Sequence, residues 1–461
     1  MGTLATAALW VVVWQVASVI VGNQILLASP WETLARLVVL VGDPTFWATV
    51  AQSFCRIALG FSLGFVAAAV LGTVAARHGW AARLVGPLLS FLKSVPLVCI
   101  IVLLLIWVGS RRVSAIAVFL VVFPAVYFSV VEGLREADPA VGQMLKVFGV
   151  GGVRSFLAHG WPSLVPFLEA TCRNVCGMAW KAGVAAEVIG SPKGTIGWNV
   201  YQAKLLLETA DLFAWTLVVV FVSWACEKAF LALLGTSSRW AMRLSLARPA
   251  SGRAGTSCEA EGAMLKDISI GHGESPVAEG LTVELRAGER VVLTDPSGAG
   301  KTTLLQTLEG LLPPLGGGAN LPRRISAVFQ ESRLIEGMSA EENVLLVAGG
   351  TLESDGARSL LAELLPQEAL GRPVAELSGG QRRRVELVRA MARPSGIVLL
   401  DEPFASLDEE SHRLAADFVV RHLAGRTLLV ASHLPGDAAL LGAREARIGT
   451  EGTSVPLAMR D

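Results

Sequence analysis

The sequence predicts two fold classes in one chain: an α-helical membrane domain of six transmembrane helices, followed by an α/β domain of the P-loop type. Long apolar segments fill the first half, and the second half combines a glycine-rich loop with short apolar runs typical of buried parallel strands. The 461 residues are 52% hydrophobic and only 17% charged. This balance is too apolar for a soluble enzyme and too polar for a chain that lies wholly in the membrane.

Apolar segments of about 20 residues, the length that crosses the hydrocarbon core as a helix, define the membrane domain. Three of them contain no charge, at residues 4–21, 57–76 and 113–131. A fourth, 84–108, is predicted to span if Lys93 reaches the interface. A sixth, 212–234, has Glu227 and Lys228 near its cytoplasmic end.

The fifth predicted span, residues 167–189, is unusual because it carries Glu169, Arg173, Lys181 and Glu187. A charge at the bilayer centre costs about 2.5–3.5 kcal/mol, so these side chains cannot all face lipid. Lys181 is therefore a candidate for holding an anionic substrate in passage. Pairing with Glu187 and snorkelling to the interface are the alternatives.

Basic loop residues predict a multi-pass protein of the cytoplasmic membrane, with the N-terminus and the second domain in the cytoplasm. The first apolar segment has no basic lead and no cleavage site, so we expect a retained anchor. Residues 247–263 shift to Ser, Gly, Ala, Arg and Glu, a composition typical of a flexible tether. We therefore expect a transmembrane domain at 1–246, a linker at 247–263 and a soluble domain at 264–461.

The soluble part is predicted to contain strands at 290–294, 397–400 and 427–431, with a helix at 302–312. Between the first strand and that helix, residues 295–303 read DPSGAGKTT, the context of a phosphate-binding loop. Its glycines let backbone N–H groups approach phosphate oxygens at a helix N-terminus. The predicted nucleotide-binding residues here are Ser297, Gly298, Gly300, Lys301, Thr302 and Thr303.

Within this loop, Lys301 should reach the β- and γ-phosphates of ATP, and the Thr302 hydroxyl should bind Mg²⁺. One position departs from the usual pattern, because Asp295 stands where glycine is expected. Two charges about 4 Å apart interact by roughly 4 kcal/mol at an effective dielectric of 20. Asp295 turned inward would therefore weaken ATP binding. The alternative is rotation outward, toward solvent or an arginine.

Two further motifs, LSGGQ at residues 377–381 and IVLLDEP at 397–403, make the soluble half resemble the ATP-binding cassette ATPases. The resemblance implies that Asp401 helps hold Mg²⁺ and that Glu402 polarises the attacking water. It also implies that Gln330 senses the γ-phosphate, contributes to the metal site and contacts the membrane domain. His433 resembles the switch histidine of the family.

Other family positions map onto Asp408, in the loop that follows the acidic strand end, and onto His272, where an aromatic residue usually stacks on adenine. In this family ATP lies between the P-loop of one subunit and the signature sequence of the other. The signature residues Ser378, Gly379, Gly380 and Gln381 are therefore expected to act in a second chain, most simply in a homodimer. The short segment between Lys301 and Gln330 suggests a trimmed peripheral antiparallel β region.

The membrane half carries EADP at residues 136–139, KVFG at 146–149 and WP at 161–162. These runs resemble the cytoplasmic loop of binding-protein-dependent importer permeases, most closely the group that serves nitrate, sulfonates, taurine and pyrimidine precursors. AEVIG at 186–190 and GTIGW at 194–198 resemble the same group. We expect a coupling helix at 145–156 that docks on the ATPase. The alternative is a surface amphipathic helix without ATPase contact.

These observations together favour ATP-driven import of a small solute by a fused permease–ATPase half-transporter. The resemblance implies a dimer in the lipid bilayer that uses ATP and Mg²⁺ and is fed by a separate extracytoplasmic solute-binding protein. An exporter and a nucleotide-responsive membrane protein that does not pump are the alternatives. A formal net charge of zero disfavours nucleic acid as a partner.

Overall fold

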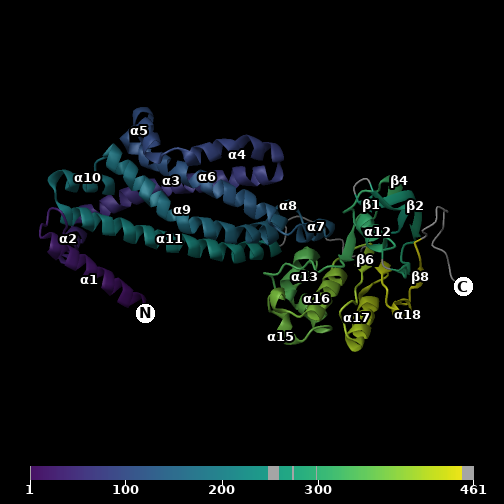
Figure 1. The fold of residues 1–461 in the computed structure, drawn as a ribbon. Coiled ribbons are helices and arrows are strands. Elements are labelled where there is room, and N and C mark those ends of the chain that lie inside the picture. The colour runs from purple at the N-terminus through teal and green to yellow at the C-terminus, as the bar shows by residue number, and fades with distance from the viewer. Residues whose placement is uncertain (1, 248–258, 273–274, 297, 449–461) are drawn as a thin grey trace. The chain divides into compact units, whose positions relative to one another are not determined.

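The computed structural model describes residues 2–247, 259–272, 275–296 and 298–448. It divides into two units, drawn together in Figure 1. The helical unit comprises Met1–Ala137 and Ser163–Ser238, and the α/β unit comprises Asp138–Pro162 and Arg239–Asp461. The segment 138–162, which lies between two long helices in the sequence, therefore belongs to the α/β unit.

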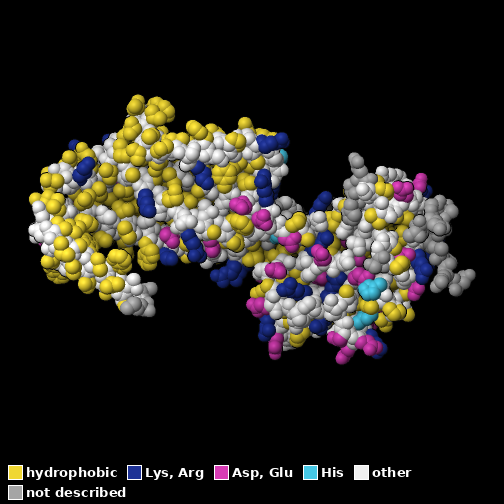
Figure 2. Space-filling model, in the orientation of Figure 1, with side chains coloured by type: hydrophobic (Ala, Val, Ile, Leu, Met, Phe, Trp, Pro, Cys, Tyr) yellow, Lys and Arg dark blue, Asp and Glu magenta, His cyan; other side chains and the backbone are white. Residues whose placement is uncertain are grey.

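The helical unit confirms the predicted α-helical first domain. Its helices are α1 (Thr3–Val21), α2 (Pro30–Val41), α3 (Pro44–Arg77), α4 (Gly79–Ser94), α5 (Leu97–Val108), α6 (Ser110–Arg135), α9 (Trp161–Gly190), α10 (Ile196–Leu206) and α11 (Thr209–Leu246). Apolar side chains cover much of this unit, whereas charged side chains are frequent on the visible face of the α/β unit (Figure 2). An apolar outer surface is what a bundle needs when its surroundings are lipid.

Small residues on α3 allow it to pack closely against α6. Gly60, Gly64, Ala68 and Gly72 recur every fourth residue on the buried face of α3. A Cβ on Gly60 would lie 2.2 Å from the carbonyl oxygen of Ala115 on α6. Such spacing of small residues lets helix backbones approach in a membrane, where van der Waals contact replaces the hydrophobic effect.

Within the described residues, three helices are long and apolar enough to cross a membrane: α3, α6 and α11. The span predicted at 84–108 is not one straight helix, because α4 and α5 are together long and apolar enough to cross a membrane but form a pair bent by 101°. The break lies at Pro96, which lacks an N–H group and restricts Val95 to an extended conformation. α1 provides a shorter apolar helix. The count of six crossings stays a prediction.

The charged residues of α9 face different ways. Glu187 is fully buried, and its Oε2 accepts hydrogen bonds from Ser53 Oγ at 2.8 Å and from the Gly197 N–H at 3.2 Å. The alternative of a Lys181–Glu187 pair is therefore wrong, since the buried carboxylate binds α3 and α10 instead. Lys181 and Arg173 are exposed on the surface of this helical unit.

A five-stranded parallel sheet forms the centre of the α/β unit, in the order β5-β6-β7-β3-β8. Its strands are β3 (Arg290–Leu293), β5 (Ile325–Val328), β6 (Ile397–Asp401), β7 (Thr427–Ala431) and β8 (Arg444–Ala446). The three predicted strands are confirmed to within one residue. An antiparallel sheet contains β1 (Ala263–His272), β2 (Ser275–Leu285) and β4 (Gly316–Asn320).

Alternate strand residues of the parallel sheet enter two hydrophobic cores. Val398 and Leu400 of β6 belong to one core, and Ile397 and Leu399 belong to the other. Burial on both faces explains why the strands are continuous apolar runs. After β3, the helices of this unit are α12 (Lys301–Leu308), α13 (Ala340–Ala348), α14 (Ser354–Ala362), α15 (Gln367–Leu370), α16 (Gly379–Ala392), α17 (Glu409–His422) and α18 (Asp437–Leu441).

The predicted coupling helix at 145–156 is wrong in its bounds. Helix α7 (Pro139–Val147) begins earlier, because Asp138 caps the Ala140 N–H at 2.8 Å and Pro139 occupies the first helical position. It ends at a left-handed Gly149, where the Val150 N–H donates to the Leu145 carbonyl at 2.8 Å. A short α8 (Gly152–Ser155) and a π-helical turn, Phe156–Gly160, follow.

Candidate nucleotide site and coupling surface

A cavity of about 710 Å³ opens at the carboxyl ends of the parallel strands. Its lining residues are Val277, Gly298, Gly300, Lys301, Thr302, Thr303, Gln330, Asp401, Glu402, Ala405 and His433. Nine of these come from the predicted site residues, although they are spread over four separate motifs. No sequence motif predicts Val277 and Ala405, which are apolar residues that the fold brings to the cavity.

Other predicted residues lie elsewhere. Within the described residues, Ser378, Gly379, Gly380, Gln381 and Asp408 are absent from the lining of this cavity. Ser297 and the side chain of His272 fall outside the described part of the chain.

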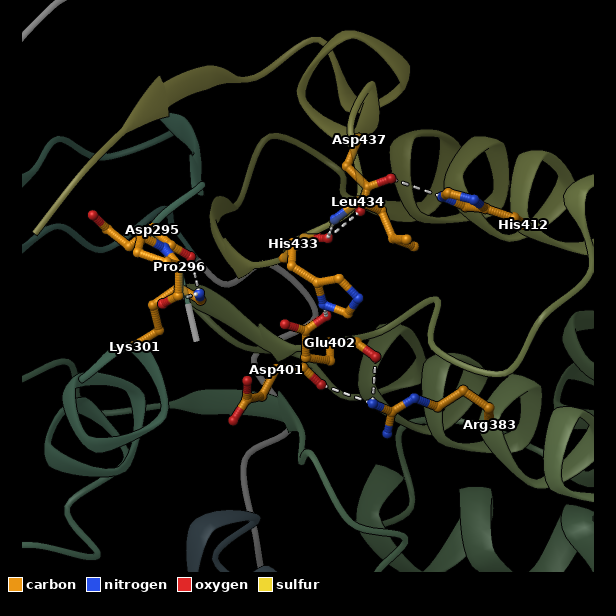
Figure 3. Close-up of polar contacts among 11 residues, drawn as sticks. Asp295, Pro296, Lys301, Arg383, Asp401, Glu402, His412, His433, Leu434 and Asp437 are labelled. Atoms are coloured by element: carbon orange, nitrogen blue, oxygen red, sulfur yellow. Dashed lines mark hydrogen bonds and ion pairs between the residues drawn. The ribbon is translucent and has the colours of Figure 1, made fainter. Parts of the chain in front are cut away.

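The P-loop connects β3 to α12 through two glycines in left-handed conformations, with φ of 87° at Gly298 and 91° at Gly300. Residues with a Cβ rarely adopt these angles, so glycine is required here for geometry. Lys301 is 8% exposed, and its Nζ donates to the carbonyl oxygens of Asp295 and Pro296 (Figure 3). The ammonium group is thus held at the loop by backbone oxygens.

Asp295 adopts neither of the two orientations considered from the sequence. It is 5% exposed, and its Oδ2 accepts a hydrogen bond of 2.7 Å from the Ile448 N–H, just after β8. The prediction of an outward orientation toward solvent or an arginine is therefore wrong. A backbone amide of a neighbouring segment satisfies the carboxylate, so the residue fastens the P-loop to the edge of the parallel sheet.

Oxygen donors suitable for Mg²⁺ meet beside the P-loop. The Thr302 hydroxyl hydrogen-bonds the carboxylate of Asp401, which is 4% exposed. Burial raises the pKa of Asp401; the Thr302 hydrogen bond opposes this shift, and the neighbouring Glu402 carboxylate reinforces it. Gln330 lines the same cavity. A hydroxyl, a carboxylate and an amide oxygen are hard ligands of the kind Mg²⁺ takes, so these residues fit that ion.

Glu402 and His433 face each other across the cavity wall, with Glu402 Oε2 2.7 Å from His433 Nδ1 (Figure 3). Glu402 has φ of 46°, an uncommon value for a residue with a side chain. Its N–H donates to the Ala431 carbonyl at 2.9 Å, which fastens this turn to β7. The carboxylate is thereby directed at the residue that follows β7 by two positions.

The signature helix contains a residue whose role the sequence did not reveal. Arg383 of α16 donates to the carbonyl oxygens of Phe329, Asp401 and Glu402 at 2.5, 2.7 and 2.5 Å (Figure 3). Its side chain is 7% exposed and also pairs with Glu386 at 3.0 Å. The spacing of Arg383 and Glu386 on one helix face was the available signal. One arginine therefore joins α16 to both the acidic turn and the Gln330 loop.

The start of α16 is stabilised by its own signature residues. Ser378 Oγ accepts from the Gln381 N–H at 3.3 Å, and Gln381 Oε1 accepts from the Ser378 N–H at 3.0 Å. This capping box fixes the first turn and leaves the Gly379 and Gly380 backbone at the helix N-terminus. A helix N-terminus favours anions, because its N–H groups and dipole are oriented toward them.

The segment 138–162 packs directly on the ATPase domain. We call this contact the coupling surface: Val141, Met144, Leu145, Phe148, Val150 and Ala158 form one apolar cluster with Ala327, Phe329, Ile335, Met338, Leu346 and Val347. Arg154 donates to the Leu346 carbonyl at 3.0 Å. The alternative of an amphipathic helix without ATPase contact is therefore wrong.

Phe148 is the centre of the coupling surface. It is fully buried, and the guanidinium carbons of Arg389 and Arg393 lie 5.2 and 5.8 Å from the centre of its ring. Both distances fall within the range of cation–π attraction. Arg389 is also fully buried, and burial lowers its pKa to about 10. The last turn of α16 thus holds the coupling surface through an aromatic ring.

A second cavity of about 200 Å³ shares Thr302, Gln330 and Asp401 with the first and is also lined by Glu309 and Arg333. Burial raises the pKa of Glu309 to about 8, against the opposing effect of Arg333. A carboxyl group in this environment is mostly protonated at neutral pH, because burial penalises its charged form.

A P-loop, an acidic strand end and a switch histidine around one cavity define the α/β unit as a P-loop ATPase, joined in one chain to an apolar helical unit. Residues 278–405 match the family model of the ABC transporter, and residues 60–245 match that of the binding-protein-dependent transport system inner membrane component.

Similar curated proteins are ATP-binding subunits. The aliphatic sulfonates import ATP-binding protein SsuB 3 of Rhodococcus jostii is 42% identical over 34% of this chain and 61% of its own length. The protein of that name from Paraburkholderia xenovorans is 40% identical over 38% of this chain and 71% of its own length. The thiamine import ATP-binding protein ThiQ of Yersinia pestis is 36% identical over 38% and 84%. A solved dimeric ATP-binding cassette with ADP and Pi is 25% identical, with a TM-score of 0.37. The match covers 41% of this chain and 95% of the cassette.

The chain belongs to the ABC transporters. It combines a helical permease domain with an ABC ATPase domain in one polypeptide. The family comprises ATPases that couple hydrolysis to transport, and ATP is the nucleotide that the ATPase domain binds.

Proposed function

We propose that the chain is half of an ATP-driven importer for a small solute, active as a dimer in the cytoplasmic membrane with its ATPase domain in the cytoplasm. The observation that carries this proposal is the presence in one chain of an ABC ATPase domain and a binding-protein-dependent permease domain. A permease of that type requires a separate extracytoplasmic solute-binding protein. The similar ATP-binding proteins described above are import proteins by name, which favours import over export.

In the proposed reaction, Glu402 orients and polarises the attacking water, and His433 holds that carboxylate through its 2.7 Å contact. Lys301 leaves its two loop carbonyls for the phosphate oxygens. Thr302, Gln330 and Asp401 hold Mg²⁺, which neutralises charge on the phosphates when bound. The loop glycines and Thr303 complete the phosphate cradle.

The proposed dimer follows from where the signature residues lie. Ser378 and Gly380 do not line the described cavity around Lys301, yet they present a capped helix N-terminus suited to phosphate. A second copy of the chain supplies that N-terminus to the nucleotide of the first. Two identical sites then form from two chains, with Asp408 close to each.

Hydrolysis is coupled to transport through the coupling surface. Phe329 and Arg333, on either side of the Gln330 loop, both contact the arginine network of α16, and Phe329 also lies in the apolar cluster with Phe148. Displacement of that loop on ATP binding therefore moves residues 138–162. The two ends of this segment continue directly into α6 and α9 of the permease.

The ATPase relatives differ in their solutes: one is named for aliphatic sulfonates and another for thiamine. These two relatives match 34% and 38% of this chain. The solute is selected by the permease and its binding protein, so the ATPase resemblance does not specify it.

The first experiment is ATP hydrolysis by the purified chain in lipid nanodiscs, beside Glu402→Gln. We expect turnover in the wild type and none in the variant. The matched control is Glu409→Gln, an exposed carboxylate at the start of α17 that pairs only with Arg413 in the described contacts. Equal turnover in wild type and Glu402→Gln would refute the proposed catalytic role. Absence of any turnover, even with candidate binding proteins added, would favour a membrane protein that does not pump.

A further inference from the structure

The segment that carries the switch histidine is held from behind by a chain of three polar side chains. His412 Nε2 on α17 lies 2.8 Å from Asp437 Oδ1, at the start of α18. Ser432 Oγ, directly before His433, donates to Asp437 Oδ2 at 2.5 Å (Figure 3). The same Ser432 oxygen accepts from the Leu434 N–H at 3.1 Å. Asp437 therefore holds Ser432 directly, and Leu434 is held through the Ser432 hydroxyl.

This arrangement is buried, whereas the residue that it surrounds is not. Asp437 and Ser432 are 1% and 2% exposed, and the His412 side chain is 17% exposed. The His433 side chain is 61% exposed and contacts Glu402 at 2.7 Å. Little packing restrains the imidazole of His433, so its direction depends on the backbone of residues 432–434.

His412 is itself well located. Its ring stacks on Phe404 with centroids 4.6 Å apart and planes 30° apart, and Phe404 follows Glu402 by two positions. Asp437 is a buried carboxylate whose described partners are His412 and Ser432. A buried charged group that loses its partner is left uncompensated, which is destabilising. We therefore expect the backbone that carries Asp437 to shift when His412 is replaced.

We propose that His412 is a positioning residue for hydrolysis, which holds Asp437 and through it directs His433 at Glu402. The inference rests on the proposed roles of Glu402 and His433. His412 has no contact with the described nucleotide cavity, so its effect passes through the switch segment. Because Asp408 is the N-cap residue of α17, this contact also links the loop before α17 to the switch segment.

The test uses the full chain in nanodiscs and compares His412→Leu with His412→Gln. We expect His412→Leu to lower kcat about tenfold and to leave the KM for ATP within twofold, because misplacement of a catalytic group by about 1 Å costs up to 10²-fold in rate. His412→Gln places a polar amide N–H near Asp437 and should recover most of the loss. If His412→Leu does not fold, Asp437→Asn carries the same test, with a loss of several-fold in kcat expected.

The chain offers a matched control in the same helix. His422 also pairs with a carboxylate, Glu363 at 2.9 Å, and packs on a phenylalanine, Phe418 at 4.4 Å, but its partners lie away from the switch segment. His422→Leu should lower the thermal unfolding midpoint as much as His412→Leu while retaining kcat. Equal kcat values for these two variants would overturn the proposal.

A double variant separates positioning from stability. If His412 acts through His433, adding His412→Leu to His433→Ala should change kcat less than twofold. A further tenfold decrease in the double variant would show an independent route and contradict the inference. If His433→Ala hydrolyses ATP as fast as the wild type, the proposed function of the site itself is refuted instead.

Discussion

Replacement of Phe148 by leucine should uncouple ATP hydrolysis from transport. Phe148 is fully buried in the coupling surface, between the guanidinium groups of Arg389 and Arg393. Leucine keeps the apolar contacts with the cluster around Phe329 but cannot attract the two cations. Each cation–π contact contributes about 0.5–2 kcal/mol, so the variant loses about 1–4 kcal/mol from the docking of this segment.

A loss of this size decreases the equilibrium ratio of docked to undocked segment by roughly five-fold to several-hundred-fold. Phe148 does not line the nucleotide cavity, so hydrolysis should continue. The assay is the number of solute molecules taken up per ATP hydrolysed in proteoliposomes. We expect this ratio to decrease at least fivefold in Phe148→Leu.

Val153→Ala is the matched control, since Val153 belongs to the same segment but is 76% exposed. Its ratio should equal that of the wild type. Phe148→Ala extends the series and should also lower the unfolding free energy by about 3–5 kcal/mol, because it creates a cavity. An unchanged ratio in Phe148→Leu, with normal hydrolysis, would refute the reasoning that this ring transmits the movement.

Three further predictions concern charged residues. Arg383→Met removes the pairing of buried Glu386 and should lower the unfolding free energy by about 3–5 kcal/mol together with kcat, whereas exposed Arg413→Met should change neither. Burial raises the pKa of Glu309 to about 8, so between pH 5 and 8 the folded chain keeps a proton on this residue that the unfolded chain releases. The free energy of unfolding of the wild type should therefore decrease by about 1.4 kcal/mol per pH unit in this range. Glu309→Gln should lack this dependence when thermal unfolding is measured across the same pH range. Lys181→Met should decrease uptake while leaving basal hydrolysis and assembly unchanged, and unaltered uptake would exclude a substrate role.

Contiguous motifs explain how much of the site could be predicted. Lys301, Asp401 and Glu402 were assigned because each lies in a run whose neighbours determine its local structure. Arg383 was missed because three of its four partners are backbone carbonyls, which have no signature in a sequence, and its spacing from Glu386 does not reveal them. His412 was missed because its partner, Asp437, follows 25 positions later in an unremarkable segment.

Errors in the fold have equally local causes. The span predicted at 84–108 took no account of Pro96, at which the apolar segment breaks into two helices. The coupling helix was placed too late because its apolar pattern continues to Phe156, whereas the backbone already reverses at Gly149. In both cases hydrophobic composition was followed past a residue whose backbone constraints end the helix.

Helix α16 gives the ATPase domain a rigid connection between its two proposed functions. Ser378 caps its first turn, Arg383 binds the acidic turn from its second, and Arg389 contacts Phe148 near its end. At about 1.5 Å per residue, its 14 residues extend roughly 21 Å. In the proposed dimer, a displacement imposed at Ser378 by the second chain's nucleotide should therefore appear at Arg383 and Phe148, because a packed helix moves as one body. The same helix would then report dimer closure to the catalytic turn and to the permease together.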